Sequence, residues 1–265
     1  MKYEKTKKGN PNRLTICQHT FPAASINRFT RNGSVEVKRI RKSKSFLLKP
    51  DNQLFCAKRV WNQSIESGFM KTIEDSYQIL AEQILGEWRM QGNIKHLNND
   101  EQDIITNMYL LWNIRDHRKR NLLENQKIGE QKTESCIETL STQRDYNPND
   151  LEIFEKNGIG VVRSDLTISN RDINQITIQL EIFKAKEKMK RDGIQWGILK
   201  ATEGQFIVPD NFSKATILPL FPSICFFSKS KNDCIGKKEV CEINKLAIES
   251  SREYYFAKSI DDCPK

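Results

Sequence analysis

A histidine beside a strongly basic segment is the first candidate for chemistry in this sequence. The chain contains only three histidines, and His19 follows the basic stretch that includes Arg13. Phosphodiester cleavage needs a group that takes a proton from the attacking oxygen and a cation that stabilises the charge developing on the phosphate. His19 could supply the first, and Arg115, at the end of an apolar stretch, could supply the second. Asp210 is a third candidate.

Each of these residues also has a structural explanation. His19 could be a hydrogen-bonded residue of the fold with no part in chemistry. Arg115 lies where a helix is predicted to end, and a cation there complements the helix dipole. Asp210 and Asn211 could form a turn in which the carboxylate binds its own backbone. Both sets of explanations stay open at this level.

Several other chemistries have no support in the sequence. There is no phosphate-binding loop of the form Gly-x-x-x-x-Gly-Lys-Ser/Thr, no Gly-x-Ser-x-Gly nucleophile turn and no His-Glu-x-x-His zinc pair. No clustered carboxylates or histidines have the spacing of metal ligands, so no metal residue is assigned. Whether a Mg²⁺ ion takes part is therefore left open.

The positive charge of the chain is concentrated at its beginning. Residues 1–60 hold 15 Lys and Arg against three acidic residues, a net charge of +12, while the whole chain has a net charge of +9. Unpaired cations that lie together bind the phosphates of nucleic acid without regard to sequence. We therefore expect a nucleic-acid partner, with RNA favoured over DNA. The residues predicted to contact it are Lys38, Arg39, Arg41, Lys42, Lys44, Arg118, Lys119 and Arg120.

The spacing of apolar residues predicts strands at both ends of the chain and helices in the middle. Asn32-Gly33 predicts a tight turn in a hairpin that spans 31–49. Apolar residues recur at helical spacing after Ser64, a predicted N-cap, and again through residues 100–115. Short strands are predicted between 196 and 227, and another at 254–257.

This order of elements predicts an α+β fold whose sheet is built from N- and C-terminal strands around a helical central region. Residues 1–13 are expected to be a flexible basic arm. Residues 14–265 are expected to form one domain, with a polar excursion near 125–148.

The seven cysteines are widely spaced and include no Cys-x-x-Cys pair. We therefore expect reduced thiols and a cytoplasmic protein. No stretch approaches 18 consecutive apolar residues, so no membrane partner is expected. The oligomeric state stays open.

The motifs, taken in order, resemble those of the prokaryotic domain-of-unknown-function family 4238. The opening motif of that family matches Gln18-His19-Thr20-Phe21-Pro22, and its two long helices match Ile73-Glu74 and Ile114-Arg115. Its C-terminal motifs match Asp210-Asn211 and Pro219-Leu220-Phe221-Pro222. The final helix, with Asn244, is similar as well. The resemblance marks Gln18, Pro22, Asn211 and Asn244 as structural residues of the motifs.

The resemblance implies an intracellular protein of anti-phage defence, with a toxic activity that a phage component triggers. Combined with the basic segment, it suggests a nuclease that acts on RNA, with tRNA as one candidate. In that hypothesis His19 is the base, Arg115 holds phosphate, and Asp210 or Glu74 orients His19 or binds a metal. The main alternative is a sensor module that binds nucleic acid or an acidic phage protein without catalysis. A third is that the cations are a solvated face with no partner.

Overall fold

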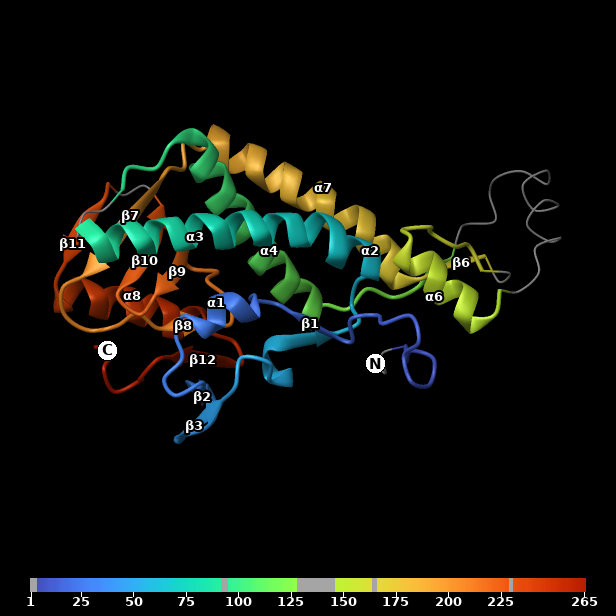
Figure 1. Cartoon of the computed structure of the whole chain (residues 1–265), viewed down its shortest axis with the longest axis horizontal. Coiled ribbons are helices and arrows are strands. Elements are labelled where there is room, and N and C mark those ends of the chain that lie inside the picture. Colours follow the sequence, from blue (N-terminus) through green and yellow to red (C-terminus); the bar gives the residue numbers. More distant parts are fainter. Residues whose placement is uncertain (1–3, 92–94, 128–145, 164–165, 229–230) are drawn as a thin grey trace.

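The computed structural model describes residues 4–91, 95–127, 146–163, 166–228 and 231–265. The fold is α+β, as the sequence predicts, with two four-stranded sheets and a set of long helices (Figure 1). Most of the polar excursion expected near 125–148 lies outside the described residues.

The strands of the described residues are short and lie mainly in the first and last quarters of the chain. They are β1 (Cys17–His19), β2 (Val35–Arg39), β3 (Ser45–Leu48), β4 (Cys56–Lys58), β5 (Gln126–Lys127), β6 (Thr167–Ile168), β7 (Trp196–Ala201), β8 (Val208–Pro209), β9 (Ile217–Phe221), β10 (Ile224–Ser228), β11 (Asp233–Ile235) and β12 (Tyr254–Ala257).

The described residues also form helices, the longest of which lie in the centre of the chain. They are α1 (Ala23–Asn27), the short 3-10 helix η1 (Gln53–Phe55), α2 (Gln63–Ile65), the π-helical turn η2 (Glu66–Met70), α3 (Lys71–Gln91), α4 (Asn99–Arg120), α6 (Pro148–Lys156), α7 (Asn170–Arg191) and α8 (Lys237–Ser250).

One sheet joins the two ends of the chain, as predicted. Its strand order is β3-β2-β12-β8, and β12 pairs antiparallel with both β2 and β8. The second sheet has the order β11-β7-β10-β9 and is made only of C-terminal strands. The N-terminal strand β2 therefore depends on a strand more than 200 residues later for its inner neighbour.

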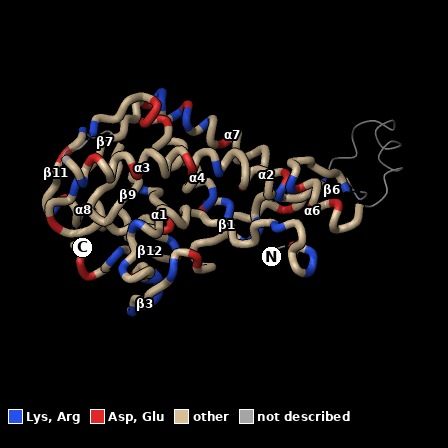
Figure 2. The backbone as a smooth tube through the Cα atoms, viewed as in Figure 1, with Lys and Arg blue, Asp and Glu red and all other residues tan. Residues whose placement is uncertain are grey.

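The hairpin predicted for residues 31–49 forms, although its turn lies elsewhere. Asn32 and Gly33 have φ angles of 53° and 74° and close a tight turn between Arg31 and Ser34, before β2 begins. The strands β2 and β3 pair through residues 35–38 and 45–48, so residues 40–44 connect them. Figure 2 shows a concentration of Lys and Arg along this hairpin, at the lower edge of the molecule.

The first long helix is continuous from α2 through the π-helical turn η2 into α3. The side-chain oxygen of Asn62 accepts from the backbone N–H of Ile65 and caps the N-terminus of the helix. The predicted N-cap, Ser64, is therefore wrong by two residues. The inward residues of the helix, Ile73, Tyr77 and Ile84, are buried, and α3 and α4 pack against each other. The predicted helical periodicity is therefore confirmed.

The segment before β1 has defined contacts from residue 4 onwards. The backbone N–H of Lys7 and the side chain of Asn12 both donate to the carboxylate of Glu152 in α6. Glu4 forms ion pairs with Arg171 at 2.6 Å and with Arg163 at 3.3 Å. Residues of the expected basic arm thus lie against α6 and α7.

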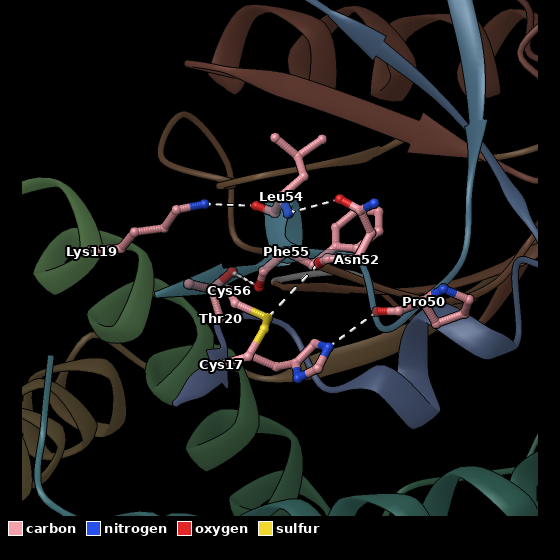
Figure 3. The surroundings of a disulfide bond; sticks show 9 residues. Cys17, Thr20, Pro50, Asn52, Leu54, Phe55, Cys56 and Lys119 are labelled. Atoms are coloured by element: carbon pink, nitrogen blue, oxygen red, sulfur yellow. Dashed lines mark hydrogen bonds between the residues drawn. A yellow bond between two sulfur atoms is a disulfide. The ribbon is translucent and has the colours of Figure 1, made fainter. Parts of the chain in front are cut away.

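The prediction that all cysteines are reduced is wrong for two of them. Cys17 in β1 and Cys56 in β4 form a disulfide bond (Figure 3). The two strands are antiparallel, with Cys17 opposite Lys58 and His19 opposite Cys56. Cys17 and Cys56 therefore lie diagonally across the strand pair, with their side chains on the same face. Because the two residues are 39 positions apart, local cysteine spacing could not reveal the pair.

Replacement of Cys17 by serine should destabilise the protein. The disulfide closes a loop of 39 residues, and loops of this length contribute about 2–4 kcal/mol to the free energy of unfolding. We expect urea denaturation of Cys17→Ser to show this loss of unfolding free energy. Reduction with dithiothreitol should destabilise the wild-type protein by the same amount and should leave the variant unchanged. Thiol titration should confirm that reduction exposes two additional free thiols in the wild type. If the urea midpoint of this reduced protein is the same as before reduction, the prediction is wrong.

Candidate functional site

The side chain of Arg115 is buried in an ionic cluster between α4 and the first long helix. It is 1% exposed. Its Nη1 donates to Oε1 of Glu74 in α3, and its Nη2 lies 3.2 Å from Oε2 of Glu66 at the start of η2. The structure therefore brings together two of the four residues predicted for catalysis, Arg115 and Glu74.

Aromatic and sulfur groups complete the surroundings of this guanidinium. The ring of Trp61 lies 5.5 Å from its central carbon, and the indole N–H of Trp61 donates to Glu66. The Nε of Arg115 lies 3.3 Å from the sulfur of Met70. Glu66 and Met70 begin and end η2, so the π-helical turn places both against Arg115. Turns of this type are frequent where a helix presents functional side chains.

The two carboxylates determine what Arg115 can do. A buried arginine held by two carboxylates has its charge balanced, and removal of one partner from such a group is strongly destabilising. Arg115 could hold a phosphate only by displacing Glu66 or Glu74. The cluster therefore fixes α4 against η2 and α3.

Asp210 lies in a different place and binds backbone. It follows β8 and is almost fully buried. Its carboxylate accepts from the backbone N–H groups of Arg252 at 2.9 Å, Glu253 at 2.7 Å and Tyr254 at 3.3 Å. Asp210 therefore fixes the entry into β12, at the pairing of β12 with β8.

Two further charged residues complete the surroundings of Asp210. Arg120, at the end of α4, pairs with Asp116 one turn earlier and lies 3.2 Å from Oδ2 of Asp210. Burial raises the pKa of Asp116 to about 6, against the attraction of Arg120, and the charge of Asp210 adds to the rise. The i, i+4 spacing of Asp116 and Arg120 is a sequence signal for this pair, but Asp116 was not among the predicted residues.

His19 is partly buried at the end of β1. Its Nε2 lies 3.1 Å from the backbone carbonyl of Pro50. A carbonyl only accepts, so Nε2 must carry the hydrogen, and in the neutral ring Nδ1 is then the basic nitrogen. Among the described residues, no hydrogen bond or ion pair connects His19 to Glu74, Arg115 or Asp210.

The remaining motif residues hydrogen-bond within the fold or cap a helix. Gln18 accepts from the backbone of Val60 at 2.7 Å and donates to Trp61, and Pro22 precedes the first turn of α1. Asn244 accepts from Ile207 and donates to two backbone carbonyls, while Asn211 donates to Asn113.

The three consecutive basic residues at the end of α4 form contacts within the fold. Arg118 pairs with Glu181 of α7 and donates to Thr177. Lys119 donates to the carbonyl of Leu54 at 2.8 Å, as Figure 3 shows. With Arg120 paired to Asp116, each of the three cations has a partner within the fold.

The basic residues of the β2–β3 hairpin have the opposite environment. Arg39, Arg41, Lys42 and Lys44 are exposed, and Lys38 is half-buried. Among the described residues, none of these five forms an ion pair with an acidic side chain. The nearest acid along the strand, Glu36, instead accepts from Ser45 and from the backbone of Ile260.

Within the described ranges, no group of three or more His, Cys, Asp or Glu side chains is arranged to hold a metal ion. Over the same residues, no helix is both long and apolar enough to cross a membrane.

Comparison with known proteins gives one partial similarity. A DNA ligase of Mycoplasma mycoides subsp. mycoides SC is 25% identical over 175 residues, which cover 58% of this chain and 25% of the ligase. The match thus spans about a quarter of that protein. No family model and no solved structure matches the chain.

The pKa of Asp116 should be measurable and should depend on Asp210. With a folded-state value near 6, above the ordinary 3.8, Asp116 favours the folded state most below about pH 4, and this contribution disappears as the pH rises through 6. We expect a carbon-detected NMR titration to place the midpoint near 6, and Asp210→Asn to lower it. A midpoint near 4, or one that Asp210→Asn leaves unchanged, would contradict this environment.

Proposed function

We propose that this chain binds nucleic acid through the β2–β3 hairpin, with RNA as the expected ligand. The observation that carries the proposal is the group of five cations at Lys38, Arg39, Arg41, Lys42 and Lys44, none of which is paired with an acid in the described structure. Cations without an acidic partner in the fold are free to replace the counterions of a phosphate backbone.

The other basic segments support this choice by contrast. The charges of Arg118, Lys119 and Arg120 already have partners in the fold. The C-terminal part of α7 also exposes cations, but Glu187 and Asp192 lie among them. The hairpin residues 38–44 contain no acid, so the positive potential is least offset there.

The shape of the hairpin suits a polymer of phosphates. Strand β3 lies at the edge of its sheet, and Leu47 on that strand is 67% exposed. An exposed edge ribbon of this kind can lie along the phosphates of a single strand, and its apolar side chain can contact unpaired bases. The partial similarity to a protein named DNA ligase favours a nucleic acid over an acidic protein as the partner.

Removal of the hairpin charges should weaken nucleic-acid binding in a salt-dependent manner. In the variant Arg39→Gln, Arg41→Gln, Lys42→Gln and Lys44→Gln, we expect fluorescence anisotropy to show about 10–100-fold weaker binding of a short RNA at about 0.1 M salt. The slope of log Kd against log salt should fall by about 0.7–0.9 for each phosphate that the variant no longer neutralises.

A variant of equal charge change provides the control. Lys184→Gln, Lys188→Gln, Lys190→Gln and Arg191→Gln removes four exposed cations from α7, which lies on the opposite side of the molecule from β3 in Figure 1. Equal loss of affinity in both variants would mean that total charge, and not the hairpin, determines binding. The same titration with single-stranded and duplex DNA tests the preference for RNA.

Cleavage of the bound RNA is a second candidate function, and the environment of His19 is the observation that favours it. With Nε2 committed to the carbonyl of Pro50, Nδ1 is the nitrogen that can accept a proton. The participation of Arg115, Glu74 and Asp210 in that reaction stays a prediction, because other groups already hold all three. The anti-phage role, its trigger and the use of Mg²⁺ likewise stay predictions.

Incubation of the purified protein with total RNA, tRNA and DNA, with and without Mg²⁺, tests this second candidate. If His19 is the base, His19→Ala should lower cleavage by about 100-fold or more, the usual contribution of such a group. His19→Gln, which can still donate to the carbonyl of Pro50, should restore stability without restoring cleavage. If no nucleic acid is cut, or if His19→Ala cuts as well as the wild type, the nuclease hypothesis is wrong.

A further inference from the structure

A cavity of about 490 Å³ lies between β4, the C-terminal end of α4 and the N-terminal end of α7. Its size falls within the range of sites that bind small molecules. The sequence gives no sign of it, because its walls come from segments more than 40 residues apart. It is separate from the exposed face of the hairpin described above.

Cations dominate the polar wall of this cavity. Lys58, Arg59, Lys119 and Arg171 all line it, and Glu4 is the one acidic residue among its lining residues. These cations come from three different parts of the fold, so their convergence is a property of the tertiary structure. Concentrated positive charge of this kind in a recess attracts an anion.

The two arginines are held in place by a carboxylate of α6. Oε2 of Glu155 lies 2.5 Å from Nη2 of Arg59 and 3.2 Å from Nε of Arg171. Glu4 accepts from Arg171 as well, and its backbone carbonyl accepts from Arg59. These contacts fix the guanidinium groups at the cavity wall, so a ligand would not have to order them. In Arg115 all three nitrogens have partners, whereas Arg171 uses only Nε and Nη1 in the contacts of the described residues, so its Nη2 can bind an anion without displacing a carboxylate.

Arg59 carries a second sign of a binding position. Its side chain is 2% exposed, yet its Nε has no hydrogen-bond partner among the described residues. Its backbone is in the left-handed region, with a φ angle of 48°. A buried donor without an acceptor is costly, and residues with strained backbone are enriched at functional sites.

The start of α7 adds to the attraction for an anion. Asn170 and Arg171, the first two residues of this 22-residue helix, both line the cavity. The N-terminus of a helix is its positive end, which favours phosphate groups. Ala57, Val60 and Leu122 form an apolar wall beside these groups.

We propose that this cavity binds a small organic phosphate, with the phosphate at Arg59, Lys119 and Arg171 and the apolar part against Val60 and Leu122. The proposal does not depend on nucleic-acid binding by the hairpin. The cationic wall attracts an anion, and the apolar wall distinguishes an organic phosphate from the inorganic ion.

Isothermal titration of the full chain with adenosine monophosphate, inorganic phosphate and adenosine tests the proposal. We expect the monophosphate to bind most tightly, inorganic phosphate more weakly, and adenosine not measurably. Amide NMR shifts on binding should be concentrated at the cavity lining, in residues 56–60, 119–125 and 170–171. The proposal is wrong if no phosphate compound binds at millimolar concentration, if the shifts lie in the hairpin, or if only 5′-phosphorylated RNA binds the cavity.

Two variants separate a binding effect from a loss of structure. Asn125→Asp keeps the oxygen that accepts from the backbone of Asn170 but adds a negative charge to the cavity wall. It should weaken monophosphate binding at least about tenfold without lowering stability, because an acid at the start of a helix is favourable. Lys119→Gln should weaken it similarly. The control Lys238→Gln, at an exposed position on α8, should bind like the wild type. Unchanged affinity in Asn125→Asp would overturn the proposal.

Discussion

The burial of charged side chains on the second half of α4 is the constraint on which the rest of the structure depends. Arg115, Asp116 and Arg118 are buried on one helix, and each needs a partner to offset the cost of leaving water. Arg115 is paired with carboxylates of η2 and α3, and Arg118 with one of α7. Asp116 is paired with Arg120 of the same helix, and Arg120 in turn contacts Asp210, the residue after β8. Helix α4 thereby positions the first long helix, the start of β12 and α7 relative to one another.

This constraint divides the cations of the chain into two kinds. The arginines of α4, at positions 115, 118 and 120, are held by carboxylates and stabilise the fold. The cations of the β2–β3 hairpin have no acidic partner in the described structure. Net charge alone cannot separate the two, because an arginine in a buried ion pair and one in solvent count equally. The distinction moves the expected nucleic-acid surface away from residues 118–120 and onto residues 38–44.

The short strand β4 connects several features that are far apart in sequence. The disulfide from Cys56 joins it to β1, where His19 lies, and Lys58 and Arg59 face the cationic cavity at its other end. Lys119 reaches from α4 to the carbonyl of Leu54 just before the strand (Figure 3). A cross-link that holds β4 in place thus also holds the position of His19 and one wall of the cavity.

The sequence by itself determined the fold class, the helical periodicity around Ile73 and Tyr77, the strand at the C-terminal end and the concentration of positive charge, because all of these depend on local pattern. Tertiary structure alone decided the Cys17–Cys56 bond, the pairing of Arg115 with Glu66 as well as Glu74, and the separation of Asp210 from them. Such contacts depend on which distant segments pack together, and the spacing of residues in one sequence carries no information about that. For the same reason a cavity assembled from several distant segments could be found only in the folded chain.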